Sequence, residues 1–193
     1  MGRRSRVQVT KELIDACRRG EPGAFDDLVH QTHRGVFTLV ARIVGDWDEA
    51  ADITQEVYVR VWKGVRRFRG DAAFSTWLYR IAANTALSYM KRRNRSGAPT
   101  DPTELPDEPV ADATEGQADA DLLERALRRL PEEARTAVVL KDVYGWSCEE
   151  IAAMMGSTEG AIKVRLFRAR QRLAIELATE GVVVPIRNKK RSS

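Results

Sequence analysis

Basic side chains and two large apolar ones share one face of the stretch GAIKVRLFRARQRL, which ends at Leu173. At about 100° per residue, Ile162, Leu166, Ala169 and Leu173 fall on a narrow stripe that a helix would bury. The opposite face carries Gly160, Lys163, Val164, Phe167, Arg168 and Gln171, flanked by Arg165, Arg170 and Arg172. Lys and Arg side chains bind phosphates and guanine edges, and apolar side chains contact thymine methyl groups. The chemistry indicated is non-covalent recognition of DNA.

A helix-turn-helix is the element that would position this face. Ser147 and Glu150 match the S-x-x-E capping box of a first helix, Gly156 suits a sharp turn, and Thr158 can cap the second helix. In such a hairpin the start of the second helix enters the major groove. The two apolar residues on the outer face could instead pack under another helix or against a protein partner.

A second basic edge lies on a predicted helix that Ser75 would cap and that runs to about Arg93. Arg80, Asn84, Leu87 and Lys91 step by 4, 3 and 4 along it, and the cluster KRRNR ends it. The loop FRGDAAFST precedes it and adds aromatic rings, which suit single-stranded or melted DNA. Phe74 and Trp77 could equally be core residues.

Catalytic and metal-binding patterns are missing from the sequence. His30 and His33 are the only histidines, and Cys17 and Cys148 are the only cysteines, without zinc-ligand spacing. There is no phosphate-binding loop, nucleophile elbow or deaminase signature. We therefore expect neither an enzyme, nor a metal site, nor a cofactor.

Charge is distributed unevenly along the 193 residues. Residues 97–121 contain eight acids and no base, whereas the rest of the chain contains 32 basic and 20 acidic residues. Two basic bodies joined by an acidic segment suggest a polyanionic partner. We find no signal peptide and no apolar run long enough to cross a membrane, so we expect a soluble, cytoplasmic protein without membrane insertion.

The periodicity predicts an all-α fold of two small helical domains joined by a flexible acidic linker. The predicted boundaries are 12–95 for the first domain, 96–118 for a Pro-rich linker, 119–178 for the second domain and 179–193 for a basic, disordered tail.

In one helix of each domain the sequence also predicts where the helix starts or ends and which residues it buries. In the first domain Asp46 or Asp48 would cap a helix that buries a wide arc, namely Ala50, Ile53, Val57, Tyr58, Val61 and Trp62. In the second domain a helix ending before Pro131 would turn Leu123, Leu127 and Leu130 inward.

These motifs resemble a known family. DITQEVYVRVWKGVRRFRGDAAFSTWLYRIAANTALSYMKRR resembles region 2 of bacterial sigma factors, and LRRLPEEARTAVVLKDVYGWSCEEIAAMMGSTEGAIKVRLFRARQRL resembles their region 4. With only a linker between the two regions, the chain is similar to the extracytoplasmic-function (ECF) class of RNA polymerase sigma factors. The resemblance implies a dissociable factor that directs core polymerase to promoters and nucleates melting.

The resemblance also implies three surfaces. Docking on the clamp helices of the largest polymerase subunit falls to Asp52, Gln55, Glu56 and Arg60. Capture of the minus-ten element falls to Thr76, Trp77, Arg80, Asn84, Leu87, Lys91, Arg92 and Arg93. Reading of the minus-thirty-five element falls to Thr158, Glu159, Gly160, Lys163, Val164, Arg165, Phe167 and Arg168. Further implied partners are the flap of the second-largest subunit and an anti-sigma factor, and the acidic linker would enter the polymerase's nucleic-acid channels.

Three positions depart from the family's usual pattern. Ser88 stands where many relatives have Asp, Ser157 where an apolar residue is common, and Cys148 where an aromatic one is common. The alternative function is that of a stand-alone helix-turn-helix transcriptional regulator, but the first domain offers no strands and no phosphorylation pocket to support it.

Overall fold

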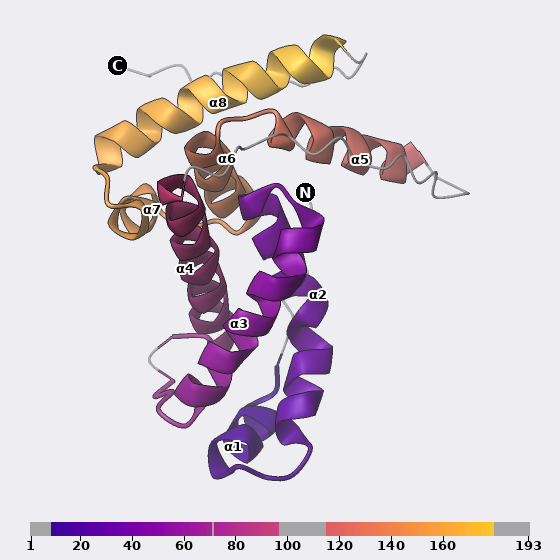
Figure 1. Cartoon of the computed structure of the whole chain (residues 1–193), viewed down its shortest axis with the longest axis vertical. Coiled ribbons are helices and arrows are strands. Elements are labelled where there is room, and N and C mark those ends of the chain that lie inside the picture. The colour runs from indigo at the N-terminus through magenta and orange to yellow at the C-terminus, as the bar shows by residue number, and fades with distance from the viewer. Residues whose placement is uncertain (1–8, 71, 97–114, 180–193) are drawn as a thin grey trace, which may run out of the picture. The chain divides into compact units, whose positions relative to one another are not determined.

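The structure is a computed structural model that describes residues 9–70, 72–96 and 115–179, and these residues form helices and no strands. The predicted all-α fold class is confirmed. The chain divides into two compact units, Met1–Thr100 and Asp101–Ser193, whose helices are labelled in Figure 1. Most of the predicted linker and all but one residue of the predicted tail lie outside the described residues.

The described residues of the first unit, 9–70 and 72–96, form four helices. They are α1 (Lys11–Arg19), α2 (Ala24–Val44), α3 (Trp47–Val65) and α4 (Phe74–Arg95). The three long helices pack pairwise against one another, and α1 packs on α2 and α3. The largest side chains in their core are fully buried, namely Leu28, Leu39, Ile43, Ile53 and Leu78. This core fixes the outward faces of α3 and α4.

The start of α3 follows a local signal. Gly45 ends α2 in the left-handed conformation, with φ of 83°, which glycine adopts without a steric cost. Oδ1 of Asp46 then accepts hydrogen bonds from the amides of Asp48, at 2.8 Å, and Glu49, at 3.0 Å. Of the two predicted caps, Asp46 is therefore the one used.

Two predictions for this unit are wrong. Ser75 does not cap α4, because the helix begins at Phe74 and Ser75 lies inside its first turn. The N-cap residue is Ala73, which has no side-chain acceptor, and its carbonyl accepts hydrogen bonds from the amides of Thr76 and Trp77. Trp62 does not belong to the buried arc. Its side chain is 50% exposed, because it lies at the rim of the packing between α2 and α3, where its ring is nearly perpendicular to that of Phe25.

The second unit contains α5 (Glu115–Arg128), α6 (Glu132–Val138), the π-helical turn η1 (Val139–Val143), α7 (Cys148–Met155) and α8 (Glu159–Thr179). Helix α8 packs against α5, α6 and α7. Pro131 lies between α5 and α6 as predicted. Helix α5 begins at Glu115, four residues before the predicted start of the second domain.

The inward face of α5 differs from the prediction by one residue. Leu127 and Leu130 are buried, but Leu123 is exposed and Leu122 is buried in its place, beside Ala126. The π-helical turn after α6 was not predicted. There the amide of Tyr144 bonds to the carbonyl of Val139, five residues back, which widens the helix by one residue.

The cap of α3 gives a stability prediction. Asp46→Ala should lower the free energy of unfolding by about 1 kcal/mol, because two first-turn amides lose their acceptor. Asp48→Ala is the matched control and should cost only a few tenths of a kcal/mol, since it removes a favourable charge near the helix N-terminus but no cap. Urea denaturation followed by circular dichroism measures both. A greater destabilisation by Asp48→Ala would contradict the assignment.

Candidate nucleic-acid and protein interfaces

The helix-turn-helix predicted from the sequence is present and is held by its caps. Oγ of Ser147 accepts a hydrogen bond from the amide of Glu150 at 3.0 Å, and the Glu150 carboxylate accepts one from the amide of Ser147 at 2.9 Å. Gly156 ends α7 with φ of 66°, and Oγ1 of Thr158 accepts a hydrogen bond from the amide of Ala161 at 3.2 Å. All four predicted signals are confirmed, so the orientation of α8 is set locally.

The outer face of α8 is exposed as expected. Ile162, Leu166, Ala169 and Leu173 are buried, whereas Val164 is 50% and Phe167 is 57% exposed. With that exposure, these two side chains do not pack under another described helix of this unit. The space around Gly160 is open, since a Cβ added there would meet nothing within 4 Å. A partner's backbone could therefore approach the start of α8 closely.

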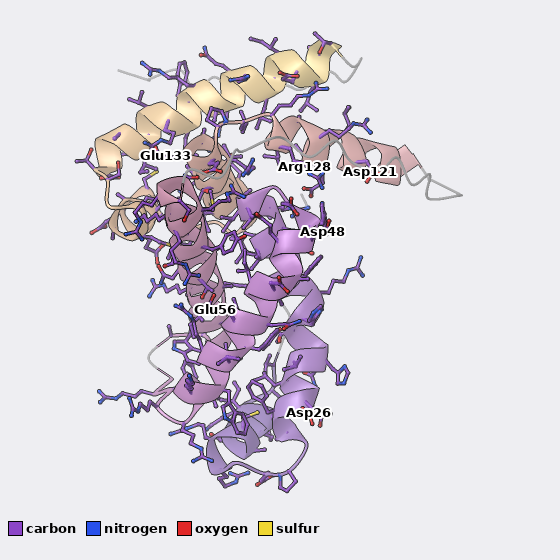
Figure 2. The ribbon with its side chains drawn as sticks, viewed as in Figure 1. Asp26, Asp48, Glu56, Asp121, Arg128 and Glu133 are labelled. Carbon is purple, nitrogen blue, oxygen red and sulfur yellow. The ribbon has the colours of Figure 1, made fainter. Side chains whose placement is uncertain are left out.

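Several cations of α8 are held by carboxylates. Nζ of Lys163 lies 2.8 Å from Glu159, and this hydrogen bond raises the pKa of Lys163. Arg165 points toward α6 and pairs with Glu133, labelled in Figure 2. Arg170 donates two hydrogen bonds to Asp142, at 2.6 and 3.0 Å, which raise the pKa of the guanidinium.

The carboxylate partners of these arginines were not predicted from the sequence. Glu133 lies on α6, 32 residues before Arg165, and Asp142 lies on the π-helical turn, 28 residues before Arg170. Only tertiary packing brings them together, and no local pattern reveals it. Arg165 therefore lies beside the predicted reading face rather than on it.

The predicted docking stripe on α3 is exposed and polar. Asp52, Gln55 and Arg60 are exposed, and Glu56 is half-buried beside them. One oxygen of Glu56 accepts a hydrogen bond from Arg60 at 2.5 Å and the other accepts one from Arg92 on α4 at 3.3 Å. The pKa of Glu56 is lowered, chiefly by the hydrogen bond from Arg60. Glu56 thus bridges the predicted docking stripe and the predicted DNA-binding helix (Figure 2).

The predicted minus-ten residues do not all share one surface. Arg80, Asn84 and Lys91 are exposed along one edge of α4, but Leu87 is only 8% exposed. Arg93 is largely buried and pairs with Glu49 of α3 at 2.6 Å. Leu87 thus faces the core, where it supports the edge that the other side chains form.

An aromatic cluster lies at the start of α4. Phe74 is buried, and Trp77 is half-buried with its ring against Phe68 and Phe74, at centroid distances of 5.2 and 5.3 Å. Gly64 of α3 lets the Trp77 ring approach, since a Cβ there would lie 3.1 Å from it. Phe74 is thus a core residue, whereas Trp77 is half core and half surface.

An apolar groove of about 410 Å³ lies between α2 and α3, beside the polar stripe. Its lining includes Phe25, Val29, His33, Gln55, Tyr58, Val59 and Trp62. Thr54 also lines the groove, and its buried Oγ1 has no hydrogen-bond partner among the described residues. The groove was not predicted; the sequence signal that could have revealed it is Val59, an apolar residue on an otherwise polar stripe.

The remaining candidate groups have structural surroundings. His33 stacks on Phe37 and Tyr58. Cys17 is buried and donates a hydrogen bond to the carbonyl of Ala24, and burial raises the pKa of its thiol. Within 9–70, 72–96 and 115–179, no three His, Cys, Asp or Glu side chains gather to hold a metal ion, and no helix is long and apolar enough to cross a membrane.

Comparisons with known proteins agree with this arrangement. Residues 28–96 match the family model of Sigma-70 region 2, and residues 120–173 match that of Sigma-70 region 4. The RNA polymerase sigma-H factor of Pseudomonas aeruginosa is 35% identical over 90% of this chain and 95% of its own. The ECF RNA polymerase sigma factor SigM of Mycobacterium tuberculosis is 39% identical over 91% of this chain and 88% of its own.

A solved structure is similar as well. It is the sigma factor RpoE of Bartonella quintana in complex with the anti-sigma factor NepR. It matches with a TM-score of 0.62 and 26% identity, over 82% of this chain and 99% of that chain. Both regions occur here in one chain and in the order of those relatives, which favours their function over that of a stand-alone regulator.

The shared carboxylate of Glu56 gives a pH prediction. Its pKa should lie below the ordinary value of 4.5, so the stability that it adds is present above that pH and is lost as the pH falls through the lowered pKa. Arg60→Gln should raise the pKa of Glu56 more than Arg92→Gln does, because Arg60 is the main cause of the shift. Carboxyl ¹³C NMR titration of the three proteins measures this order, and the reverse order would contradict it.

Proposed function

Because the chain belongs to the ECF sigma factors of RNA polymerase, we propose that it docks on core polymerase through α3 and reads promoter DNA with α4 and α8. The observation that carries the proposal is the exposed pair Val164 and Phe167 on a helix with a fully buried opposite stripe. A solvated helix has no use for two large apolar side chains among cations. In a DNA major groove, by contrast, such apolar side chains can contact thymine methyl groups.

At the minus-thirty-five element, the start of α8 enters the major groove. Lys163 donates to a guanine edge or a phosphate, Val164 and Phe167 contact thymine methyl groups, and Arg168 adds charge at the rim. Thr158, Glu159 and the open Gly160 lie nearest the bases. Arg165 contributes by bracing α8 against α6 through Glu133.

At the minus-ten element, the loop residues 68–70 and the exposed edge of α4 take one melted strand. Bases stack on or near Trp77, which is already held at a fixed angle by two phenylalanines. Arg80, Asn84 and Lys91 follow the backbone of that strand, and Arg92 extends its positive path toward the end of α4. Arg93 contributes by bracing α4 against α3 through Glu49.

Core docking uses a polar stripe next to an apolar groove. Asp52, Gln55 and Glu56 supply carboxylate and amide oxygens for the cations of the largest subunit's clamp helices. Val59 and Trp62 supply exposed apolar area beside them. Interfaces of moderate size combine a few polar contacts with apolar anchors of this kind.

Further partners follow from the relatives. RpoE of Bartonella quintana is described with an anti-sigma factor, and we extend such a partner to this chain. The second domain (119–178) would also contact the flap of the second-largest subunit. The acidic linker (96–118), which joins the first domain (12–95) to the second, would lie in the polymerase's positively lined channels. The proposal implies that the chain acts in the cytoplasm with the polymerase.

The direct test is reconstitution. The purified chain, added to bacterial core polymerase, should form a complex and produce run-off transcripts from promoters mapped by transcript starts after its overexpression. Asp52→Asn should weaken the core complex about five-fold, because it removes one charge whose pairing with the clamp helices is worth roughly 1 kcal/mol. Surface plasmon resonance measures this affinity. Failure of the wild-type chain to bind any bacterial core would refute the proposal.

The reading face of α8 gives a prediction about contacts between one side chain, Phe167, and individual thymine methyl groups. Phe167→Ala should lower affinity for minus-thirty-five DNA about ten-fold, because it removes apolar contact worth roughly 1.4 kcal/mol, and should leave core affinity unchanged. Replacing each thymine with deoxyuridine, which lacks the methyl group, should weaken the wild type at one or two positions. The affinity of the variant should not change when the thymine that Phe167 contacts is replaced with deoxyuridine. Equal sensitivity of both proteins at all positions would contradict the assignment.

A further inference from the structure

Arginines gather where α1 ends. The last turn of α1 carries Arg18 and Arg19, followed by Gly20 in the left-handed conformation, with φ of 75°. At the end of α3, residues 63–70 include four cations and no acid. Arg66, Arg67 and Arg69 of this stretch are exposed.

One contact joins the two groups. A Cβ added to Gly20 would lie 3.1 Å from Nη2 of Arg66, so this guanidinium lies against the C-terminal end of α1. The free carbonyls at a helix C-terminus attract a cation, which accounts for its position. Arg66 therefore lies close to the end of α1 that carries Arg19. The two arginine groups form one surface, here termed the α1-end surface (Arg18, Arg19, Arg66, Arg67 and Arg69).

The arginines of α1 keep hydrogen-bonding capacity for a partner. Arg18 pairs with Asp15 at 3.3 Å and Arg19 with Glu21 at 2.7 Å, each through one nitrogen. A guanidinium has five N–H donors, and both side chains are well exposed. Exposed pairs of this kind contribute little stability, so a stronger anion can share or replace the carboxylate.

We infer that the α1-end surface binds the phosphate backbone of promoter DNA next to the loop that captures the melted strand. Phe68, the first residue of that loop, lies between Arg67 and Arg69, and its ring packs on Phe74 and Trp77. A strand held at Trp77 thus meets a segment with Arg67 and Arg69 on either side of Phe68, and Arg66 continues it toward the end of α1. Planar guanidinium groups bind phosphate oxygens with two hydrogen bonds each. This inference rests on the proposed function.

The surface adds to what the family match covers. The Sigma-70 region 2 match begins at residue 28, so α1 lies before it. Neither Arg18 nor Arg19 belongs to the minus-ten residues predicted from the sequence. Helix α1 therefore has a role beyond packing on α2 and α3, namely to widen the cationic path available to the captured strand.

The test compares holoenzymes built on wild type, the double variant Arg18→Gln/Arg19→Gln, and two controls. Lys11→Gln removes a charge at the other end of α1, and Arg18→Lys/Arg19→Lys keeps both charges. The probe is a premelted promoter fragment labelled with a fluorophore, titrated at several salt concentrations. Urea denaturation and core affinity are measured for every protein.

The double Gln variant should bind the probe more weakly. Its slope of log affinity against log salt should fall by about 0.7 for each single-strand phosphate that is no longer neutralised. Lys11→Gln should match wild type, and the double Lys variant should recover most of the slope.

Two results would overturn the inference. One is an unchanged slope in a folded double Gln variant. The other is a weakened core complex with intact probe binding, which would assign the surface to a protein partner. A wild-type chain that binds neither core nor promoter would instead refute the proposed function.

Discussion

The burial of one apolar face on each long helix is the constraint on which the functional surfaces depend. On α8 the stripe consists of four side chains spaced 4, 3 and 4 residues apart, all buried. A rotation of the helix by one residue, about 100°, would bring Lys163 into the core, where an unpaired charge costs several kcal/mol. The outward direction of Val164 and Phe167 is therefore set by residues that never meet a partner.

Carboxylates from neighbouring elements hold several of the arginine side chains that the buried stripes leave on the surface. Glu56 holds Arg92, Glu49 holds Arg93 and Asp142 holds Arg170. Each pair limits the rotamers of a long side chain. Under the proposed function, the exposed Arg92 and Arg170 therefore lose less entropy on meeting a phosphate. The more exposed pairs, such as Glu56 with Arg92, contribute about 1 kcal/mol or less and yield to DNA. Arg93 is largely buried and stays with Glu49 as a brace between α3 and α4.

Local signals predicted the parts of this fold that local chemistry determines. The capping box at Ser147, the left-handed Gly156 and the cap at Thr158 each involve residues within a few positions of one another. The stripe of α8 follows from helical periodicity alone. The family resemblance named the stripe on α3, which by composition is only a solvated face.

Apart from the cap at Ser75, the predictions that failed concern features that tertiary packing decides. Trp62 and Leu123 sit at the border of an apolar arc, and only the angle of the neighbouring helices determines that both face solvent. The π-helical turn inserts a residue between two helical segments of ordinary propensity, so periodicity does not reveal it. The position of Arg66 against Gly20 joins residues far apart in the sequence. Charge-bearing surfaces of this chain were thus harder to predict than its caps, because a charge has no periodic pattern to follow.

Two separate cores change what each DNA contact must contribute. Each unit buries its own apolar stripe, so neither reading surface depends on the other unit for its shape. When one unit is bound, the second binds at an effective local concentration rather than from bulk solution, which multiplies affinity without new contacts. Under the proposed function, a few thymine methyl contacts on Val164 and Phe167 and a short row of cations on α4 are then sufficient. For the same reason the inferred phosphate contacts of α1 would matter for the whole chain. Each further contact on one unit raises the affinity with which both units together bind DNA.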